Sequence, residues 1–262
     1  VAMRCKKCNA RLAEHDLWCV FCGMVSPVIH TELSSMSSMK RTRKALKAKY
    51  SEMVPATGFS IIMGVIPIAV LIWVFHNYIH TDGTSQFLLT LMAKALLFSL
   101  VAPFMLLPFS RISASDSYEL KLSAILAQLK HYPRYFVFSL INAIFFVLIY
   151  LICFGFPGFA SDPILRLVWI VLLNYWAAIV APAPVIMERM EINPLKAIAL
   201  SYRHLHDVRW NTYLLVLVLG ILNILAFSLA IFPLLFTLPL SWFAIRDYTI
   251  RLEQYELFDY RM

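Results

Sequence analysis

The chain has 262 residues, of which 61% are hydrophobic and 15% charged, and its net charge is +8. Soluble domains average about 45–50% apolar and about 25% charged residues, so these values exclude a soluble monomer. The aromatic content of 14% excludes a disordered chain. Five cysteines, four of them in one cluster, do not make a secreted disulfide scaffold. The composition therefore predicts a protein that crosses a membrane several times.

Two Cys-x-x-Cys pairs open the chain, Cys5 with Cys8 and Cys19 with Cys22. Two such pairs at this separation supply four thiolates, which is the tetrahedral ligand set of a structural zinc ion. Four cysteines close the coordination shell, whereas a catalytic zinc keeps an open position. A redox-active pair would need a βαβ context that is missing from this segment. We therefore predict one structural zinc ion per chain, which supplies most of the folding energy of this small segment.

The segment Arg4–Met24 resembles the short zinc-ribbon family found at the amino termini of many bacterial membrane proteins. That family has a Cys-x-x-Cys-Gly knuckle, a short hairpin, an aromatic residue and a second Cys-x-x-Cys-Gly. Here Trp18 takes the aromatic place, and Asn9 replaces the first glycine, a position where asparagine also tolerates positive φ. The resemblance implies that the zinc is structural. For the ribbon we favour contact with another protein, with no partner as the alternative, over contact with nucleic acid.

A short tether rich in serine and methionine, at 34–39, leads into a strongly basic strip. Each cation near an anionic leaflet contributes about 1 kcal/mol, so the strip is expected to bind anionic lipid on the cytoplasmic face and to orient the first span. A regulatory or partner-binding strip is the alternative. The six cations are Lys40, Arg41, Arg43, Lys44, Lys47 and Lys49.

Long apolar runs fill the rest of the chain and predict six transmembrane helices. A helix needs about 20 residues to cross about 30 Å of hydrocarbon. The last run, 212–243, is about half as long again as one span and contains Pro233, so we divide it into spans at 212–231 and 233–250. The first four spans are expected at 57–79, 87–109, 135–156 and 165–187.

The positions of lysine and arginine predict that both termini are cytoplasmic. Ten of these cations precede the first span, four lie between the second and third spans, four lie between the fourth and fifth, and three lie at the carboxyl-terminal end. The other three connections hold none, which is the alternation expected from the positive-inside rule. A count of five spans would place the three arginines of the tail outside, so the charges favour six.

A repeated pattern predicts that the spans form three hairpins. Basic amphipathic stretches at 118–129 and 195–205 precede the second and third hairpins and are expected to lie in the membrane interface. Asn193 and Pro194 supply the N-cap and first residue of the second stretch. Chance similarity of apolar sequence is the alternative origin of the repeat. Each returning helix carries a proline followed seven or eight residues later by an arginine, at Pro103, Pro182 and Pro239.

The stretch at 193–203 reads Asn-Pro-x-Lys-Ala-x-x-x-Ser-Tyr-Arg, and Trp210 and an apolar hairpin ending at Leu238-Pro239 follow it. This arrangement resembles a broad family of bacterial six-helix membrane proteins, related to the membrane domain of some glycerophosphodiester phosphodiesterases. Tyr202 stands where that family more commonly has tryptophan. The family has no settled activity, so the resemblance implies a six-helix fold in a bacterial inner membrane and no particular chemistry.

Polar residues inside the predicted spans form a possible intramembrane polar site. A buried cation is costly and by default marks a functional position, but a lysine near the outer interface can also extend its charge to water. Both interpretations of the lysine stay open, and Asp82 and Asp162 are its nearest acidic candidates. The asparagines are expected to form interhelical hydrogen bonds. The four residues are Lys94, Asn142, Asn174 and Asn223.

The sequence holds no nucleophile motif, phosphate loop or carboxylate pair, so we expect no enzymatic activity. We predict an accessory or scaffold subunit of a membrane complex, whose zinc ribbon docks other membrane-protein subunits. The apolar stripe Ile245, Tyr248, Leu252 and Tyr255 predicts a second docking surface. The alternative function is a lipid-handling or small-solute transporter with a cavity between the hairpins.

The expected fold is an all-α polytopic membrane protein with six transmembrane helices, arranged as three hairpins with interfacial amphipathic helices, and a small amino-terminal zinc ribbon. It divides into a cytoplasmic ribbon at 1–26, a tether and basic juxtamembrane helix at 27–56, a transmembrane domain at 57–250 and a cytoplasmic tail at 251–262.

Overall fold

The structure is a computed structural model that describes residues 3–4, 11–12, 35–78, 84–114, 126–154, 163–204, 209–229 and 232–254. These residues are almost entirely helical, which confirms the predicted helical class for this part of the chain. A short antiparallel ladder joins β1 (Met3–Arg4) to β2 (Arg11–Leu12). The described helices, in chain order, are α2 (Ser35–Ser60), the π-helical turn η1 (Ile61–Val65), α3 (Ile66–Tyr78), α4 (Thr84–Val101), α5 (Pro103–Ala114), the 3-10 turn η2 (Gln128–His131), α7 (Tyr132–Phe154), α8 (Pro163–Val180), α9 (Ala183–Met190), α10 (Pro194–His204), α11 (Arg209–Leu229) and α12 (Leu234–Gln254).

Five helical stretches in the described ranges are long and apolar enough to cross a membrane, and they coincide with the first five predicted spans. The helix at the sixth predicted span, α12, is not among them, because its second half carries Arg246, Asp247 and Arg251. The five stretches are Met53–Tyr78, Gln86–Phe109, Gln128–Phe154, Pro163–Met190 and Trp210–Leu229.

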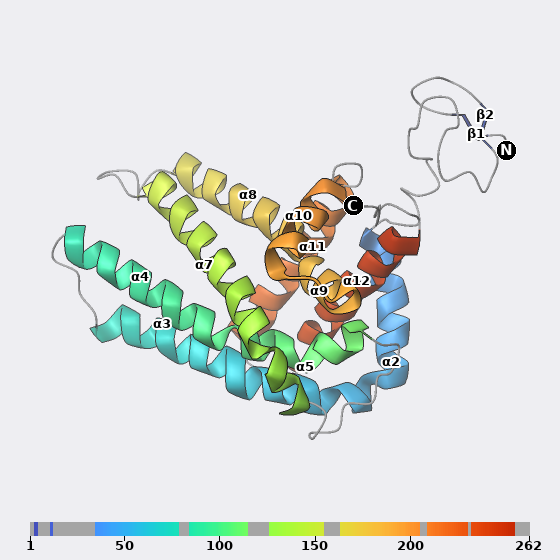
Figure 1. Ribbon diagram of the computed structural model, residues 1–262, viewed down its shortest axis with the longest axis horizontal. Coiled ribbons are helices and arrows are strands. Elements are labelled where there is room, and N and C mark those ends of the chain that lie inside the picture. The colour runs from blue at the N-terminus through green and yellow to red at the C-terminus, as the bar shows by residue number, and fades with distance from the viewer. Residues whose placement is uncertain are drawn as a thin grey trace.

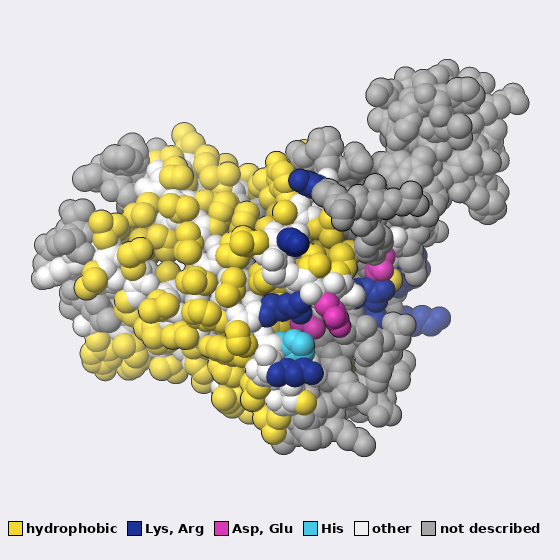
Figure 2. Space-filling view, in the orientation of Figure 1, with side chains coloured by type: hydrophobic (Ala, Val, Ile, Leu, Met, Phe, Trp, Pro, Cys, Tyr) yellow, Lys and Arg dark blue, Asp and Glu magenta, His cyan; other side chains and the backbone are white. Residues whose placement is uncertain are grey.

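The outer surface of these helices is apolar over one end of the molecule. Side chains such as Leu89, Ile152 and Ile164 are more than two-thirds exposed. Figure 2 shows hydrophobic side chains covering this apolar end, whereas the charged side chains in view gather at the opposite, charged end. In water such a surface would drive aggregation, whereas lipid tails cover it in a bilayer. The surface is thus compatible with a protein that crosses the membrane several times.

The chain bends where α2 passes into α3. Figure 1 shows the first half of α2 running across the charged end, crosswise to α3, which extends toward the apolar end. Pro55 lies inside α2, and η1 follows it directly. Proline and a π turn both interrupt the regular hydrogen-bond ladder and are the usual causes of such a bend. The helix therefore continues through the predicted boundary at residue 56 and bends close to it.

Two of the three repeated prolines stand at helix breaks. Helix α5 begins at Pro103 directly after a one-residue break, and α9 begins directly after Pro182. After both breaks the helix resumes in the same way, since the amides of Met105 and Val185 each donate to the carbonyl three residues earlier, at 3.0 and 3.1 Å. Pro239 instead lies within the uninterrupted α12. The repeat therefore extends to local geometry in the first two hairpins and not in the third.

The main core lies at the charged end, where the two segments that follow the breaks, α5 and α9, pack against each other. Helices α7, α8, α10, α11 and α12 complete this core. Its members are large apolar side chains with almost no exposed surface, and each contributes about 1.5–3 kcal/mol when buried. They include Leu107, Tyr135, Ile186, Met187, Leu215, Tyr248 and Leu252.

Helix α12 runs antiparallel along α2. Near the start of α12 the Phe236 ring stacks on Tyr50, with 4.9 Å between ring centroids. Near its end Asp247 pairs with Arg41. Between these points Trp242 packs in a cluster with residues of α2 and α5. The second half of α12 is therefore fixed to the first half of α2 at the charged end.

Helix α10 begins as the sequence predicts. The Asn193 carboxamide oxygen accepts a hydrogen bond from the amide of Lys196 at 2.8 Å, and Pro194 is the first residue of the helix. This N-cap satisfies one of the amides that a helix leaves free at its first turn.

The predicted apolar stripe of α10 is divided between two faces. Ile198 is buried, whereas Leu195 and Tyr202 are exposed. The small residues Ala197 and Ser201 face the core instead, and Ser201 donates a hydrogen bond to the carbonyl of Ile179 at the end of α8. Small side chains allow this close approach of two helices.

Candidate functional site

The four cysteines predicted to bind zinc lie outside the described residues. The ladder formed by β1 and β2 brackets the first cysteine pair in the sequence, with Arg4 opposite Arg11. In the described part of the chain, no group of three or more histidine, cysteine or acidic residues is placed to hold a metal ion. Cys153, which the structure does describe, is free and buried. The zinc site thus remains a prediction from the sequence.

The basic strip occupies the outward face of α2. Ser38, Thr42 and Leu46 are buried at intervals of four residues, which is the spacing of one helical face, and they seat the helix on the protein. The side chain of Lys49 lies outside the described residues. The exposed cations of the opposite face are Lys40, Arg43, Lys44 and Lys47.

Arg41 differs from these neighbours because it forms an ion pair within the protein. Its Nε and Nη2 donate to Oδ2 of Asp247 at 3.1 and 2.9 Å. Ser38 donates to the same oxygen at 3.2 Å, and Arg251 Nε lies 3.5 Å from Oδ1 of the carboxylate. We name these four residues the α2–α12 clamp. Arg41 is therefore engaged by α12, whereas the sequence predicts that it binds lipid.

A second set of charged groups joins α9 to its neighbours at the charged end. Arg189 donates to Glu253 of α12 at 2.7 Å. The adjacent Glu188 is only 8% exposed and lies beside the fully buried Tyr135. Glu188 Oε1 and the Tyr135 hydroxyl make no hydrogen bond within the described part of the structure. Glu253 therefore contributes an ion pair with Arg189, whereas Glu188 is part of the buried core.

The predicted docking stripe on the carboxyl-terminal helix is wrong for the residues that the structure describes. Tyr248 and Leu252 are 1% and 0% exposed, because α12 turns this face into the main core. The Tyr248 hydroxyl is hydrogen bonded to Thr212 of α11 at 2.7 Å. Tyr255 lies outside the described residues. A partner would have to unfold the end of α12 to reach this stripe.

Each of the three asparagines joins a different pair of helices. Asn142 of α7 accepts a hydrogen bond from the Trp176 indole of α8 at 2.8 Å. Asn174 of α8 donates to the carbonyl of Tyr213 in α11 at 3.4 Å. The third, Asn223 of α11, donates to the hydroxyl of a serine in α12 at 2.7 Å. Amides in these positions stabilise helix packing by about 0.6 kcal/mol on average.

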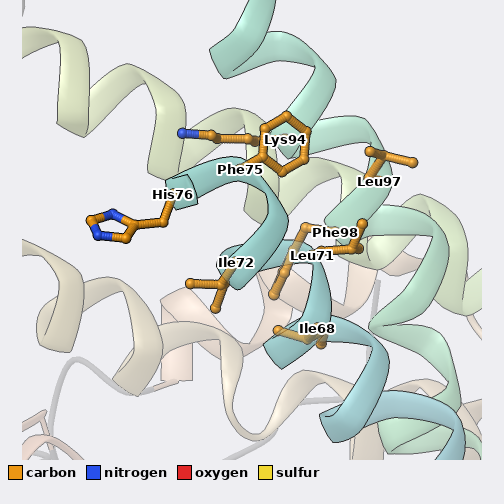
Figure 3. Close-up of a pocket in the computed structure, with 8 residues that line it drawn as sticks. All are labelled: Ile68, Leu71, Ile72, Phe75, His76, Lys94, Leu97 and Phe98. Carbon is orange, nitrogen blue, oxygen red and sulfur yellow. The ribbon is translucent and has the colours of Figure 1, made fainter. Parts of the chain in front are cut away.

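Lys94 lies apart from the asparagines, in a groove between α3 and α4. The groove has a volume of about 310 Å³. Figure 3 shows Lys94 and His76 extending to the same side of the two helices. The ammonium group lies over the ring of Phe75, 5.2 Å from its centroid, which is the geometry of a cation–π contact. The remaining lining is apolar: Ile68, Leu71, Ile72, Leu97 and Phe98.

The structure therefore divides the predicted intramembrane polar site into separate features. Of the four residues, only Lys94 lines the groove, and that groove lies within one hairpin. The asparagines connect helices elsewhere in the bundle. Asp82 and Asp162, the acidic candidates for Lys94, lie outside the described residues. The α2–α12 clamp was not predicted as a unit, although the spacing of Asp247 and Arg251, four residues apart, is visible in the sequence.

Comparison of the chain with protein-family models, with curated proteins and with solved structures found no match. Both resemblances stated from the sequence therefore stay predictions, and the function has to be argued from the residues.

Proposed function

We propose that this protein is a non-enzymatic scaffold subunit of a bacterial inner-membrane complex, which holds a zinc ribbon at the cytoplasmic membrane surface for docking other subunits. The α2–α12 clamp is the observation that carries this proposal. It fixes the start of α2, which follows the ribbon and tether in the sequence, to the second half of α12. A ribbon attached to a fixed helix stays at a defined place on the membrane, which is what a docking module requires.

The exposed face of α2 supports a position at the surface of an anionic leaflet. Lys40, Arg43, Lys44 and Lys47 all point away from the protein, while the opposite face packs on α12. When a helix lies in the plane of the membrane interface, its exposed cations attract anionic headgroups. The strip would thus bind lipid and leave the ribbon free for protein contact, without any role for nucleic acid.

The clamp also supports six membrane helices with both termini in the cytoplasm. Ser38 contacts Asp247, so these residues lie on the same side of any membrane that the protein crosses. Five crossings between them would place them on opposite sides. Helix α12 would therefore return the chain to the side on which α2 begins, as the partner of α11 in a third hairpin. Reporter fusions at the two ends test this, and a carboxyl-terminal reporter that is active only outside the cytoplasm would contradict it.

The ribbon is proposed to hold one structural zinc ion on Cys5, Cys8, Cys19 and Cys22. The pairing of β1 with β2 around the first cysteine pair supports this, because it matches the short hairpin of a zinc ribbon. Metal analysis of the purified protein should give about one zinc per chain. The double substitution Cys5→Ser with Cys22→Ser should abolish zinc binding, and zinc retained in this variant would refute the four-cysteine site.

Docking is tested by cross-linking in cells followed by purification in mild detergent. The native chain should yield other membrane-protein subunits at fixed stoichiometry, and the ribbon variant Cys5→Ser with Cys22→Ser should lose them. Cys153→Ser is the matched control, because that cysteine is free and buried in the bundle. If the native chain purifies without another subunit, or if the ribbon variant keeps its partners, the scaffold proposal is wrong.

A further inference from the structure

The groove between α3 and α4 is built from one stripe of each helix. Its residues on α3 run from Ile68 to His76 at intervals of three and four, and those on α4 are Lys94, Leu97 and Phe98. The α3 stripe is about 12 Å long, from eight residues at 1.5 Å each. Helix α3 packs chiefly on α4 and η1, so the groove lies at the edge of the bundle. In a membrane, this edge faces lipid.

The cation in this groove is separated from the acidic side chains of the described residues. The carboxylates whose side chains are described belong to Glu188, Glu191, Asp247 and Glu253, on α9, α12 and the turn after α9, at the charged end, whereas the side chain of Glu52 lies outside the description. The Lys94 ammonium instead contacts the face of an aromatic ring. A positive charge in apolar surroundings is costly, so an anion beside it would be strongly favoured.

The reach of Lys94 brings its charge toward the membrane surface. Its backbone lies ten residues into α4, about 15 Å from the start of the helix. The ammonium group nevertheless lies beside Phe75, only three residues from the end of α3. The Trp73 and Tyr78 rings contact edge to face at this end, and such residues are typical of the membrane interface. Lys94 therefore extends toward the headgroup level.

We propose that the α3–α4 groove binds an anionic phospholipid of the outer leaflet. The lipid phosphate lies between the Lys94 ammonium and the His76 ring, which extend to the same side (Figure 3). One acyl chain follows the apolar floor formed by Ile68, Leu71 and Leu97 toward the bundle interior. Charge complementarity selects the headgroup, and the apolar lining selects a lipid over a free anion. This site is distinct from the basic strip, which lies at the opposite end.

The test uses a phosphatidylglycerol with a photoreactive group in its acyl chain, added to the full-length protein in mild detergent. Cross-linked peptides are located by mass spectrometry. The peptides of α3 and α4 that line the groove should be labelled. Unlabelled phosphatidylglycerol should displace the probe, and phosphatidylcholine or millimolar inorganic phosphate should not. Labelling of α2 peptides reports the basic strip and serves as an internal reference.

Charge variants test the role of Lys94. Lys94→Met should lower groove labelling about tenfold, the loss expected for one hydrogen bond to a charged group, and should leave α2 labelling unchanged. Lys94→Arg should retain the labelling. Arg166→Met is the matched control, since it removes another cation from the apolar end. Unchanged groove labelling in Lys94→Met would overturn the proposal.

Two further variants distinguish a bound lipid from an ion pair and from a simple anion site. Leu97→Trp fills the groove and should abolish labelling there, whereas Leu89→Trp on the outer surface of the same helix should not. Asp82→Asn should leave labelling unchanged. Labelling that emerges only in Asp82→Asn would mean that Lys94 forms an ion pair with Asp82, and displacement by inorganic phosphate would mean a simple anion site. Either result would overturn the lipid proposal.

Discussion

The α2–α12 clamp makes a prediction that can be calculated from its geometry. Asp247 accepts from both Arg41 nitrogens and from Ser38, and Arg251 lies close to its second oxygen. Asp247→Ala removes all of these contacts and takes away the carboxylate that lies between the two arginines. We expect the free energy of unfolding to fall by about 2–3 kcal/mol, within the range for partly buried charged hydrogen bonds.

The coupling between Arg41 and Asp247 is expected to be smaller than this loss. Their side chains are 31% and 28% exposed, so solvent weakens the pair relative to a buried one. Exposed ion pairs contribute about 0.2–1 kcal/mol, and breaking a buried pair costs about 3–5 kcal/mol. We therefore expect a coupling energy of about 1–2 kcal/mol between Arg41 and Asp247, which lies between these two cases.

A double-mutant cycle of Arg41→Ala and Asp247→Ala measures this coupling, with equilibrium unfolding in mild detergent followed by tryptophan fluorescence. Arg43→Ala is the matched control, because Arg43 is exposed on the opposite face of the same helix. Its coupling to Asp247→Ala should be close to zero. A coupling below about 0.3 kcal/mol for Arg41, or an equal value for Arg43, would refute the clamp.

The remaining predictions concern helix packing, and each is measured by the same unfolding assay. Gly64→Ala should destabilise by about 1–3 kcal/mol, because an added Cβ would clash with Met105 Cγ and lie 3.1 Å from its backbone nitrogen. Gly58→Ala, where nothing lies within 4 Å, should instead be neutral or stabilising by up to about 1 kcal/mol, and equal effects would contradict this packing. Asn142→Leu should cost about 0.6–1.7 kcal/mol by breaking an interhelical hydrogen bond, and no loss would argue against that bond. Asn193→Ala should cost about 1 kcal/mol and Asn193→Asp almost nothing, whereas equal losses would argue against the cap.

The five helices that are long and apolar enough to cross a membrane were predictable because their signal is local. A run of about 20 apolar residues identifies a span by its length and composition, and no other part of the chain is needed to recognise it. The Asn193 cap was predictable for the same reason, since a cap depends on only four neighbouring residues. Local rules also show why α12 was harder to interpret, because it combines an apolar first half with four charged residues in the second.

Features that depend on pairing between distant segments could not be predicted. Arg41 reads as one more cation of a lipid-binding strip until Asp247 is placed beside it. The stripe containing Tyr248 reads as a free amphipathic face, because the sequence does not say which helices cover it. The Lys94 groove likewise depends on which faces of α3 and α4 meet, and the sequence does not show this. The sequence did show that Lys94 lies within a span, where a cation is energetically costly.

The clamp also has a consequence for the order in which the protein is made. Ser38 and Asp247 are separated by 209 positions in the chain, so their contact can form only after α12 has been synthesised. Until α12 has been synthesised, α2 lacks one of its main packing partners and keeps its contacts with α5 and α11. A chain shortened before α12 would lose the hydrogen bonds that Ser38 donates to Ala244 and Asp247, so the start of α2 would be held less firmly. The start of α2 therefore reaches its final position only after nearly the whole of this sequence has been synthesised.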